Sequence, residues 1–163
     1  MFNEGRVHIF IVEDNEIYSM MLDYILSKDS VYKFTSFKSG EDCVRNLHQN
    51  PDVVILDYAL PGINGYETLV EIKKYNPHIH VLMLTNNKDL DLARKILNAG
   101  ADDYILKQGH GEKQIIEKVE ALLEHDSIKH KERLRTETKL FFKRLAYCVA
   151  IGSLVAAGLI YFT

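Results

Sequence analysis

The sequence predicts an α/β fold, a doubly wound sheet of five parallel strands that helices cover on both faces. Two observations support this class. Short apolar segments rich in Val and Ile alternate five times with segments in which apolar residues recur at helical spacing. The central apolar segments show no polar alternation, which is typical of parallel strands buried on both faces. Strict alternation of strands and helices implies right-handed crossover connections, and therefore parallel pairing.

The chain opens with a predicted central strand and an amphipathic helix. Residues 7–12 form a nearly continuous apolar run that stops at Glu13 and Asp14. Asn15 then stands where a helix N-cap is expected. The apolar residues that follow have helical spacing and predict the buried stripe of the helix. They are Ile17, Met20, Met21, Tyr24, Ile25 and Leu26.

The second strand is expected at an edge of the sheet. Tyr32 and Phe34 alternate with Lys33 and Thr35, and Phe37 follows less regularly. This alternation predicts that one face of the strand is exposed to solvent. A polar helix follows, with three apolar side chains directed inward. These are Cys43, Val44 and Leu47.

The remaining elements repeat the alternation. Pro51 introduces the strongly apolar strand 53–56, and a turn-forming cluster at 61–65 leads into a helix that Asn76 and Pro77 stop. Strands 81–84 and 104–106 and helices 88–99 and 112–124 complete the prediction. The fifth strand is short, which places it at the second edge and favours the strand order 2-1-3-4-5, the flavodoxin-like arrangement.

Charge is unevenly distributed along the 163 residues. Segment 1–125 carries 20 acidic and 13 basic side chains, segment 126–145 carries 3 and 7, and segment 146–163 has none. We therefore expect an acidic domain, a basic helical linker and an apolar C-terminal helix. The length excludes a multidomain enzyme, and the acidic domain would repel nucleic acid. Cys43 and Cys148 allow no disulfide or zinc framework, so we predict a cytoplasmic setting for the domain.

Polar residues follow the predicted strands at their carboxyl ends, where ligands bind in open parallel sheets. Glu13 and Asp14 follow the first strand, Asp57 the third, Thr85 the fourth and Lys107 the fifth. Three carboxylates brought close together repel one another unless cations balance them. Oxygen ligands with room for waters and a phosphate suit Mg²⁺, so we predict a Mg²⁺ site here.

The chemistry that fits this inventory is phosphoryl transfer to an aspartate. Asp57 is the candidate nucleophile, because a carboxylate is ionised at neutral pH and attacks phosphorus without a general base. Phosphoryl transfer mainly requires positioning and counter-charge, which Mg²⁺, Lys107 and the Thr85 hydroxyl can each supply to one oxygen.

The order and spacing of five stretches resemble the receiver domain of bacterial two-component response regulators, of the kind found in chemotaxis regulators. The stretches are 11–15, 51–57, 60–67, 84–85 and 100–107. The resemblance covers the domain but not the C-terminal extension.

The resemblance implies that Asp57 accepts phosphate from a histidine kinase or a phosphotransfer protein. It also implies that Asp14, Asp57 and the backbone carbonyl of Ala59 bind Mg²⁺, with Glu13 helping through water, and that Lys107 pairs with the phosphoryl group. Beyond Mg²⁺-dependent self-phosphorylation and autodephosphorylation, no enzymatic activity is expected.

By the same resemblance, Thr85 swings toward the phosphoryl group and Tyr104 turns inward behind it. The face formed by the fourth helix, fifth strand and fifth helix then rearranges, and partners or a second copy dock there. The chain departs from the usual pattern at Asn86, where a very small residue is common, and at Gln108, where many receivers have proline.

The C-terminal segment 146–162 is predicted to anchor the chain to the cytoplasmic face of a membrane. Its 17 residues are uncharged, and as a helix they span about 25 Å, slightly less than a hydrocarbon core of about 30 Å. Tyr147 and Tyr161 stand near its two ends, and basic residues precede it. A four-three spacing of apolar residues from Leu134 to Phe162 alternatively predicts helix pairing and a homodimer.

Two other function classes remain open. A degenerate receiver could serve as a membrane-anchored or coiled-coil oligomerisation module. A flavodoxin-like binding module is the third reading, but three acids at a phosphate-facing edge argue against flavin.

Overall fold

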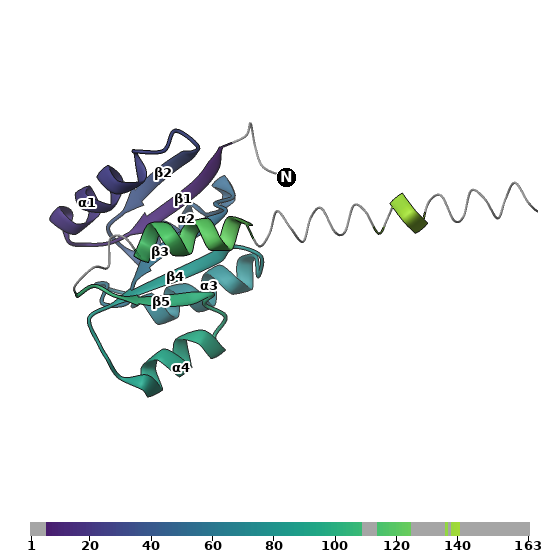
Figure 1. Cartoon of the computed structure of the whole chain (residues 1–163). Helices are drawn as coiled ribbons and strands as arrows, with labels where there is room; N and C mark the ends of the chain where they lie inside the picture. Colours follow the sequence, from purple (N-terminus) through teal and green to yellow (C-terminus); the bar gives the residue numbers. More distant parts are fainter. Residues whose placement is uncertain (1–5, 109–113, 125–135, 137, 141–163) are drawn as a thin grey trace, which may run out of the picture. The chain divides into compact units, whose positions relative to one another are not determined.

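The computed structural model describes residues 6–108, 114–124, 136 and 138–140. The chain divides into two units, Met1–Ala121 and Leu122–Thr163, which are described separately. In the second unit the described residues are few, and those at 136 and 138–140 are helical. The first unit carries the sheet (Figure 1).

The sheet has five parallel strands in the order β2-β1-β3-β4-β5, which confirms the predicted fold class and both predicted edges. The strands are β1 (Val7–Val12), β2 (Tyr32–Phe37), β3 (Val53–Asp57), β4 (His80–Thr85) and β5 (Asp103–Leu106). Every residue of β1 and β3 is buried, whereas β2 is half-buried apart from the exposed Lys33 and Ser36; Thr35, predicted on the exposed face, is half-buried. This difference follows from their central and edge positions.

The register of the strands brings their carboxyl ends to one edge of the sheet. Val12, the last residue of β1, pairs with Leu56 of β3, and Thr85, the last residue of β4, pairs with Leu106, the last residue of β5. The polar residues that end or follow these strands are therefore neighbours in space.

Four helices and one 3₁₀ turn connect the strands, and residues 114–124 are also helical. The elements are α1 (Glu16–Leu26), α2 (Gly40–Arg45), the 3₁₀ turn η1 (Leu47–Gln49), α3 (Gly65–Tyr75) and α4 (Leu90–Asn98). Leu47 therefore lies beyond the second helix, in η1, but it is buried as expected. The fourth helix begins two residues later than predicted because Asp89 caps it.

Side-chain caps fix the starts of α1 and α3. The side chain of Asn15 accepts a hydrogen bond from the Tyr18 N–H, as its predicted role requires. At α3, Asn64 accepts from the Glu67 N–H while the Glu67 carboxylate accepts from the Asn64 N–H, which completes a capping box.

Two apolar layers hold the helices against the sheet, and Figure 1 shows helices in front of it and behind it. Alternate strand residues pack with buried side chains of α2, α3 and α4 in one cluster, which includes Phe10, Val12, Val54, Leu56, Val81, Met83, Cys43, Leu69, Ile72 and Ile96. Strand residues of the opposite parity, such as Ile9 and Ile55, are also fully buried. Because successive side chains point to opposite faces of a sheet, both faces are covered.

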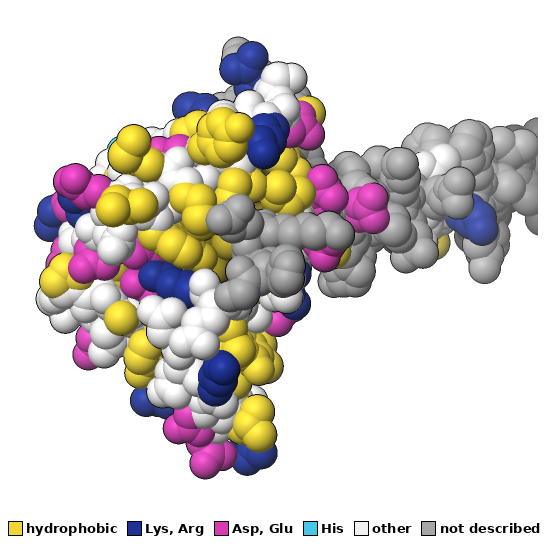
Figure 2. Space-filling view, turned by 60° about the vertical axis from the view of Figure 1, so that its left-hand side comes forward, with side chains coloured by type: hydrophobic (Ala, Val, Ile, Leu, Met, Phe, Trp, Pro, Cys, Tyr) yellow, Lys and Arg dark blue, Asp and Glu magenta, His cyan; other side chains and the backbone are white. Residues whose placement is uncertain are grey.

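The predicted buried stripe of α1 is wrong in part. Ile17, Met20 and Tyr24 are 82%, 70% and 67% exposed, whereas Leu22 and Leu26 are buried together with Ile25. The helix has apolar residues around most of its circumference, so spacing alone did not identify the face that packs on the sheet. Figure 2 shows hydrophobic side chains at the surface on the side of the molecule that carries α1.

The predicted linker 126–145 and apolar segment 146–163 lie outside the described residues, apart from 136 and 138–140. Within the described part of the chain, no helix is long and apolar enough to cross a membrane.

Candidate functional site

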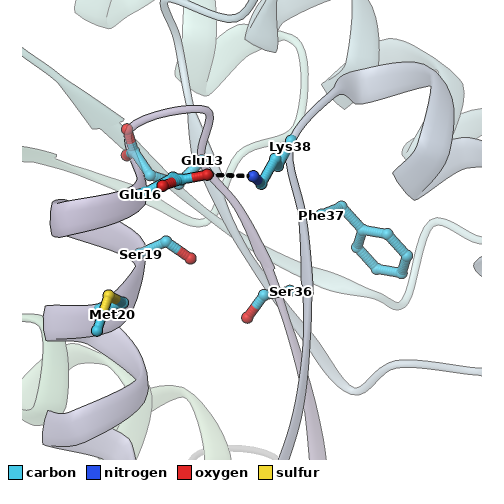
Figure 3. Close-up of a pocket in the computed structure, with 7 residues that line it drawn as sticks. All are labelled: Glu13, Glu16, Ser19, Met20, Ser36, Phe37 and Lys38. Carbon is cyan, nitrogen blue, oxygen red and sulfur yellow. Dashed lines mark hydrogen bonds and ion pairs between the residues drawn. The ribbon is translucent and has the colours of Figure 1, made fainter.

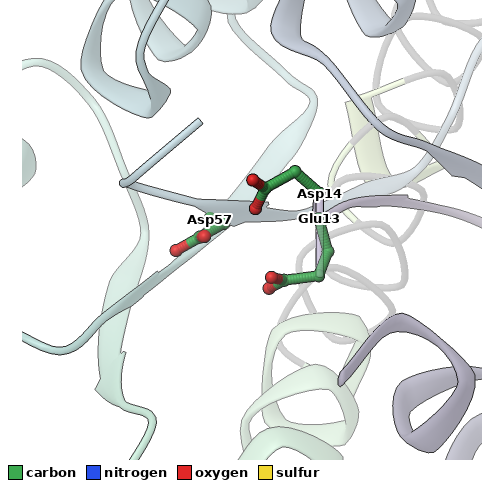
Figure 4. Close-up of side chains that lie close together, drawn as sticks. All are labelled: Glu13, Asp14 and Asp57. Carbon is green, nitrogen blue, oxygen red and sulfur yellow. The ribbon is translucent and has the colours of Figure 1, made fainter. Parts of the chain in front are cut away.

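Three carboxylates meet at the carboxyl edge of the sheet. Glu13 and Asp14 follow β1 directly, and Asp57 is the last residue of β3. Each offers one oxygen, and these oxygens all lie within 4.8 Å of one another. Figure 4 shows the three side chains gathered at the ends of the two strands. Glu13 and Asp57 are buried, whereas Asp14 is exposed, so the cluster opens to solvent on the side of Asp14.

One ammonium group joins two of these acids. Lys107 follows β5, and its backbone N–H donates to the Thr85 carbonyl at 2.9 Å, which extends the pairing of β5 with β4 by one step. Its Nζ lies 2.6 Å from Glu13 Oε2 and 2.9 Å from Asp57 Oδ2, and its side chain is 10% exposed. One cation does not balance three carboxylates, so the site keeps a negative charge that attracts a further cation.

The second oxygen of Asp57 has no partner within the described part of the chain. Asp57 Oδ1 is buried and accepts no hydrogen bond. A buried carboxylate oxygen without a partner is costly, and such groups usually meet a cation or an ordered ligand. The oxygen-only donor set of the cluster suits a hard divalent cation. The residues present therefore fit a divalent metal.

Burial also changes the acidity of Glu13. Burial raises the pKa of Glu13 above its ordinary value, and the charge of Asp57 acts in the same direction. The hydrogen bond and charge of Lys107 and the N–H of Asn15 lower the pKa, but they do not outweigh burial and the charge of Asp57 together. Glu13 is therefore less readily ionised than an exposed glutamate.

Thr85 ends β4, the strand that pairs with β3, and Tyr104 lies on β5, one strand farther from the cluster. Thr85 is buried, and its hydroxyl oxygen accepts a hydrogen bond of 3.0 Å from the Asn87 N–H. Tyr104 pairs with Met83, two residues before Thr85 on β4, and its half-buried ring packs against the core. Ala59, the expected source of a metal-binding carbonyl, is exposed in the connection between β3 and α3.

The connection between β3 and α3 is tightly packed at the end nearest Asp57. The Tyr58 N–H donates to the Leu84 carbonyl, and the Gly65 N–H donates to the Tyr58 carbonyl, both at 2.9 Å. A Cβ atom at Gly65 would stand 2.1 Å from the Asp57 carbonyl oxygen. Gly65 therefore lets the start of α3 approach the backbone of the candidate nucleophile.

Tyr18 also lies at this site, and the sequence did not predict its place there. The Lys107 Nζ lies 4.7 Å from the centroid of the Tyr18 ring. Its position in the sequence could have predicted this placement. Tyr18 lies in the first turn of the helix that follows Glu13 and Asp14, and that turn starts at the edge of the sheet where the acids gather.

A pocket of about 250 Å³ lies between α1 and β2 beside the carboxylates (Figure 3). An ion pair between Glu16 of α1 and Lys38, the residue that follows β2, forms part of its lining. The residues that line it are Glu13, Glu16, Ser19, Met20, Ser36, Phe37 and Lys38. Glu13 is the residue that it shares with the carboxylate cluster, so the pocket is a neighbour of the site and not the site itself.

Comparison with known proteins identifies the same domain. The family model described as the response regulator receiver domain matches residues 9–120. A solved structure, the BeF3-activated receiver domain of DrrB, a Thermotoga maritima response regulator, superposes with a TM-score of 0.67. The two sequences are 29% identical, and the match covers 73% of this chain and 98% of the DrrB domain.

Curated relatives share this part of the chain. The transcriptional regulatory protein DegU of Brevibacillus brevis is 26% identical over 162 residues, which cover 89% of this chain and 68% of DegU. A cyclic di-GMP phosphodiesterase of Thermotoga maritima is 36% identical over 99 residues, which cover 61% of this chain but 26% of that protein. Several other curated relatives are spanned to less than half of their length, among them AfsQ1 of Streptomyces coelicolor (45%) and CssR of Bacillus subtilis (44%).

Proposed function

This chain belongs to the response regulator receiver domain family, and on that premise we propose that it accepts a phosphoryl group on Asp57. The observation that carries the proposal is the asymmetry of the Asp57 carboxylate. One oxygen is paired with Lys107 at 2.9 Å, while the other is buried beside two further acids and has no hydrogen-bond partner among the described residues. An oxygen that no neighbouring group occupies is available to form a bond with phosphorus.

We further propose that the cluster holds Mg²⁺. Asp14, Asp57 and the backbone carbonyl of Ala59 would bind it, with Glu13 helping through water. The ion would offset the negative charge of the carboxylates and of the phosphoryl oxygens. The close approach of the three carboxylate oxygens supports this set of ligands.

The chemical step needs little from the protein besides position and charge. An Asp57 oxygen attacks the phosphorus atom of a phosphohistidine on a kinase or phosphotransfer protein. A P–O bond forms and the P–N bond of the donor breaks; the electron pair stays on the imidazole, which takes up a proton. No general base is required, since a carboxylate nucleophile carries no proton at neutral pH.

The proposal also gives roles to three residues near the acids, Lys107, Thr85 and Tyr104. Lys107 would turn from the Asp57 carboxylate to a phosphoryl oxygen, and the Thr85 hydroxyl would exchange the Asn87 N–H for another. Tyr104 would move inward behind Thr85. The resulting change at α4, β5 and the helix at 114–124 would alter the binding of a partner protein or of a second copy.

The test is phosphorylation by a small donor. The protein is incubated with acetyl phosphate and Mg²⁺, and its intact mass is measured. The wild type should gain one PO₃ unit, while Asp57→Asn should gain none. Asp91→Asn removes a carboxylate that is 88% exposed on α4 and should be labelled like the wild type. An unlabelled wild type, or equal labelling of Asp57→Asn, would overturn the proposal.

A degenerate receiver that acts only as an oligomerisation module is not favoured. The three acids and the lysine are all present, and they converge on one another. A domain that had lost phosphoryl transfer would have no need for this costly arrangement.

We also propose that segment 146–162 tethers the chain to the cytoplasmic face of a membrane, with helix pairing as the alternative. Its uncharged composition and basic flank support this. Detergent-free fractionation should place the full chain with membranes and a chain ending at residue 140 in the supernatant. Identical fractionation of the two chains would contradict the tether.

A further inference from the structure

Two carboxylates and one uncharged ring lie beside the ammonium group of Lys107 in the described part of the chain. The carboxylates are those of Glu13 and Asp57, at 2.6 and 2.9 Å. The ring is that of Tyr18, whose centroid lies 4.7 Å from Nζ. The lysine side chain is 10% exposed, so these neighbours replace most of its water.

An aromatic face attracts a cation through its quadrupole, and the attraction is stronger where the cation is poorly hydrated. The Lys107 ammonium lies near the Tyr18 ring and is largely removed from water. We propose that Tyr18 is a positioning residue, which holds the Lys107 ammonium in place while its other partners change. The proposal rests on the proposed function of Asp57 as phosphoryl acceptor.

The reason for a ring at this position follows from the charge balance of the site. When Asp57 accepts the phosphoryl group, its contact with Lys107 must give way to a contact with a phosphoryl oxygen. Glu13 remains as the charged partner, but a further carboxylate in place of Tyr18 would repel the incoming phosphoryl group. The ring retains the cation without adding negative charge.

The backbone at Tyr18 is also fixed. Its N–H donates a hydrogen bond of 3.0 Å to the side chain of Asn15, the N-cap of α1. The first turn of α1 therefore starts from the same loop as Glu13 and Asp14, and it presents Tyr18 to a lysine that is 89 residues away in sequence. This local order lowers the entropic cost of holding the ring over the ammonium.

The test compares Tyr18→Phe, which keeps the ring, with Tyr18→Leu, which removes it. Initial rates of phosphorylation by acetyl phosphate are measured at saturating Mg²⁺, and Mg²⁺ affinity is measured separately by titration. We expect Tyr18→Phe to stay within about twofold of the wild type and Tyr18→Leu to be slower by about tenfold, the size of a largely desolvated cation–π contact. Mg²⁺ affinity should not fall in either variant, because the proposed role of the ring is to hold Lys107 and not to bind the ion.

Each outcome is decisive. Equal rates for Tyr18→Leu and Tyr18→Phe, or a weaker Mg²⁺ affinity that accounts for the slower rate, would overturn the positioning role. If Tyr18→Leu fails to fold, Tyr18→Met fills the same space with a flexible apolar side chain and takes its place. A wild type that accepts no phosphoryl group would overturn the proposed function instead, so the two failures are distinguishable.

Discussion

At the scale of single residues, the two oxygens of Asp57 have different surroundings. Oδ2 forms an ion pair with Lys107, which also pairs with Glu13, and Oδ1 is buried with no hydrogen-bond partner in the part of the chain that the structure describes. The carboxylate is therefore held in position by one oxygen and left unsatisfied at the other. This asymmetry leads to a prediction about metal binding.

Mg²⁺ should stabilise the folded protein. A ligand that binds only the folded state adds about 2.7 kcal/mol at a hundredfold excess over its Kd. We expect the midpoint of thermal unfolding to rise with Mg²⁺ concentration in the wild type and in Asp91→Asn. In Asp57→Asn the rise should be much smaller, since this change removes a ligand and part of the negative charge. A rise of equal size in all three proteins would contradict the assigned site.

The sequence identified these acids but not their pairing. The sequence was enough to predict that Glu13, Asp57 and Lys107 lie close together, because the carboxyl ends of parallel strands share one edge of the sheet. The contact of Lys107 with both acids, and with the ring of Tyr18, depends on side-chain orientation. No rule of spacing describes a contact between a helix residue and a residue 89 positions later.

At the scale of elements, the site depends on how closely α3 approaches the end of β3. A Cβ atom at Gly65 would meet the Asp57 carbonyl oxygen at 2.1 Å and the Tyr58 Cα at 2.7 Å. Both are backbone atoms, so neither can turn aside as a flexible side chain does. Gly65 thus couples the start of a helix to the position of Asp57.

Gly65→Ala should therefore lower both stability and phosphorylation. We expect the free energy of unfolding to fall by roughly 1–3 kcal/mol, as in other overpacked sites. The rate of labelling by acetyl phosphate should fall as well, because Asp57 must shift. Val70→Ala, at a position of the same helix that is 40% exposed, is the control and should change neither quantity appreciably. Normal labelling of Gly65→Ala would show that α3 does not set the position of Asp57.

Strands and helix caps were more predictable than helix faces. Asn15 marks the start of a helix because its side chain can cap it, and Asp57 marks the end of a strand because it is the polar residue that ends an apolar run. In α1, by contrast, Ile17 and Met20 belong to an apolar stripe that faces solvent. Two stripes of similar hydrophobicity share this helix, and only packing against the sheet selects one of them.

At the scale of the whole molecule, a second charged cluster joins elements at the opposite end of β4 from the three carboxylates Glu13, Asp14 and Asp57. Asp102 accepts hydrogen bonds from His80 Nδ1 at 2.7 Å, from the Val81 N–H at 2.8 Å and from Lys73 at 3.2 Å. The Lys73 ammonium also donates to the Ile79 carbonyl at 2.7 Å. This cluster ties α3, the start of β4 and the turn before β5 to one another.

The Asp102 cluster should make stability depend on acid pH. Partial burial raises the pKa of Asp102, but the hydrogen bonds from His80 and Val81 and the charge of Lys73 outweigh burial and lower it to about 2. A lowered folded-state pKa stabilises the protein above the ordinary value of 3.8, and this contribution disappears as the pH falls through about 2. It amounts to roughly 2 kcal/mol at most.

Urea unfolding of the wild type and of Asp102→Asn between pH 6 and pH 3 measures this contribution. The wild type should be more stable at pH 6, and the difference between the two proteins should narrow as the pH falls. The raised pKa of Glu13 changes stability with pH in the opposite direction. Because both proteins contain Glu13, this effect cancels in the difference between their free energies of unfolding. A difference that does not change with pH would contradict the role of Asp102.

The receiver domain accounts for the described sheet, and the family model ends at residue 120 of the 163. Residues 121–163, with the basic and apolar segments, lie beyond the match. From the net negative charge of residues 1–125 we predict that the domain does not bind nucleic acid directly, because it would repel phosphate groups.

The most direct test of the central claim is to locate the phosphoryl group chemically. The phosphorylated protein is reduced with borohydride, which converts an aspartyl phosphate to homoserine, and the peptides are then sequenced by mass spectrometry. We predict homoserine at position 57 and intact aspartate at positions 14 and 52. Intact aspartate at position 57 in a protein that carries the PO₃ unit would contradict the account.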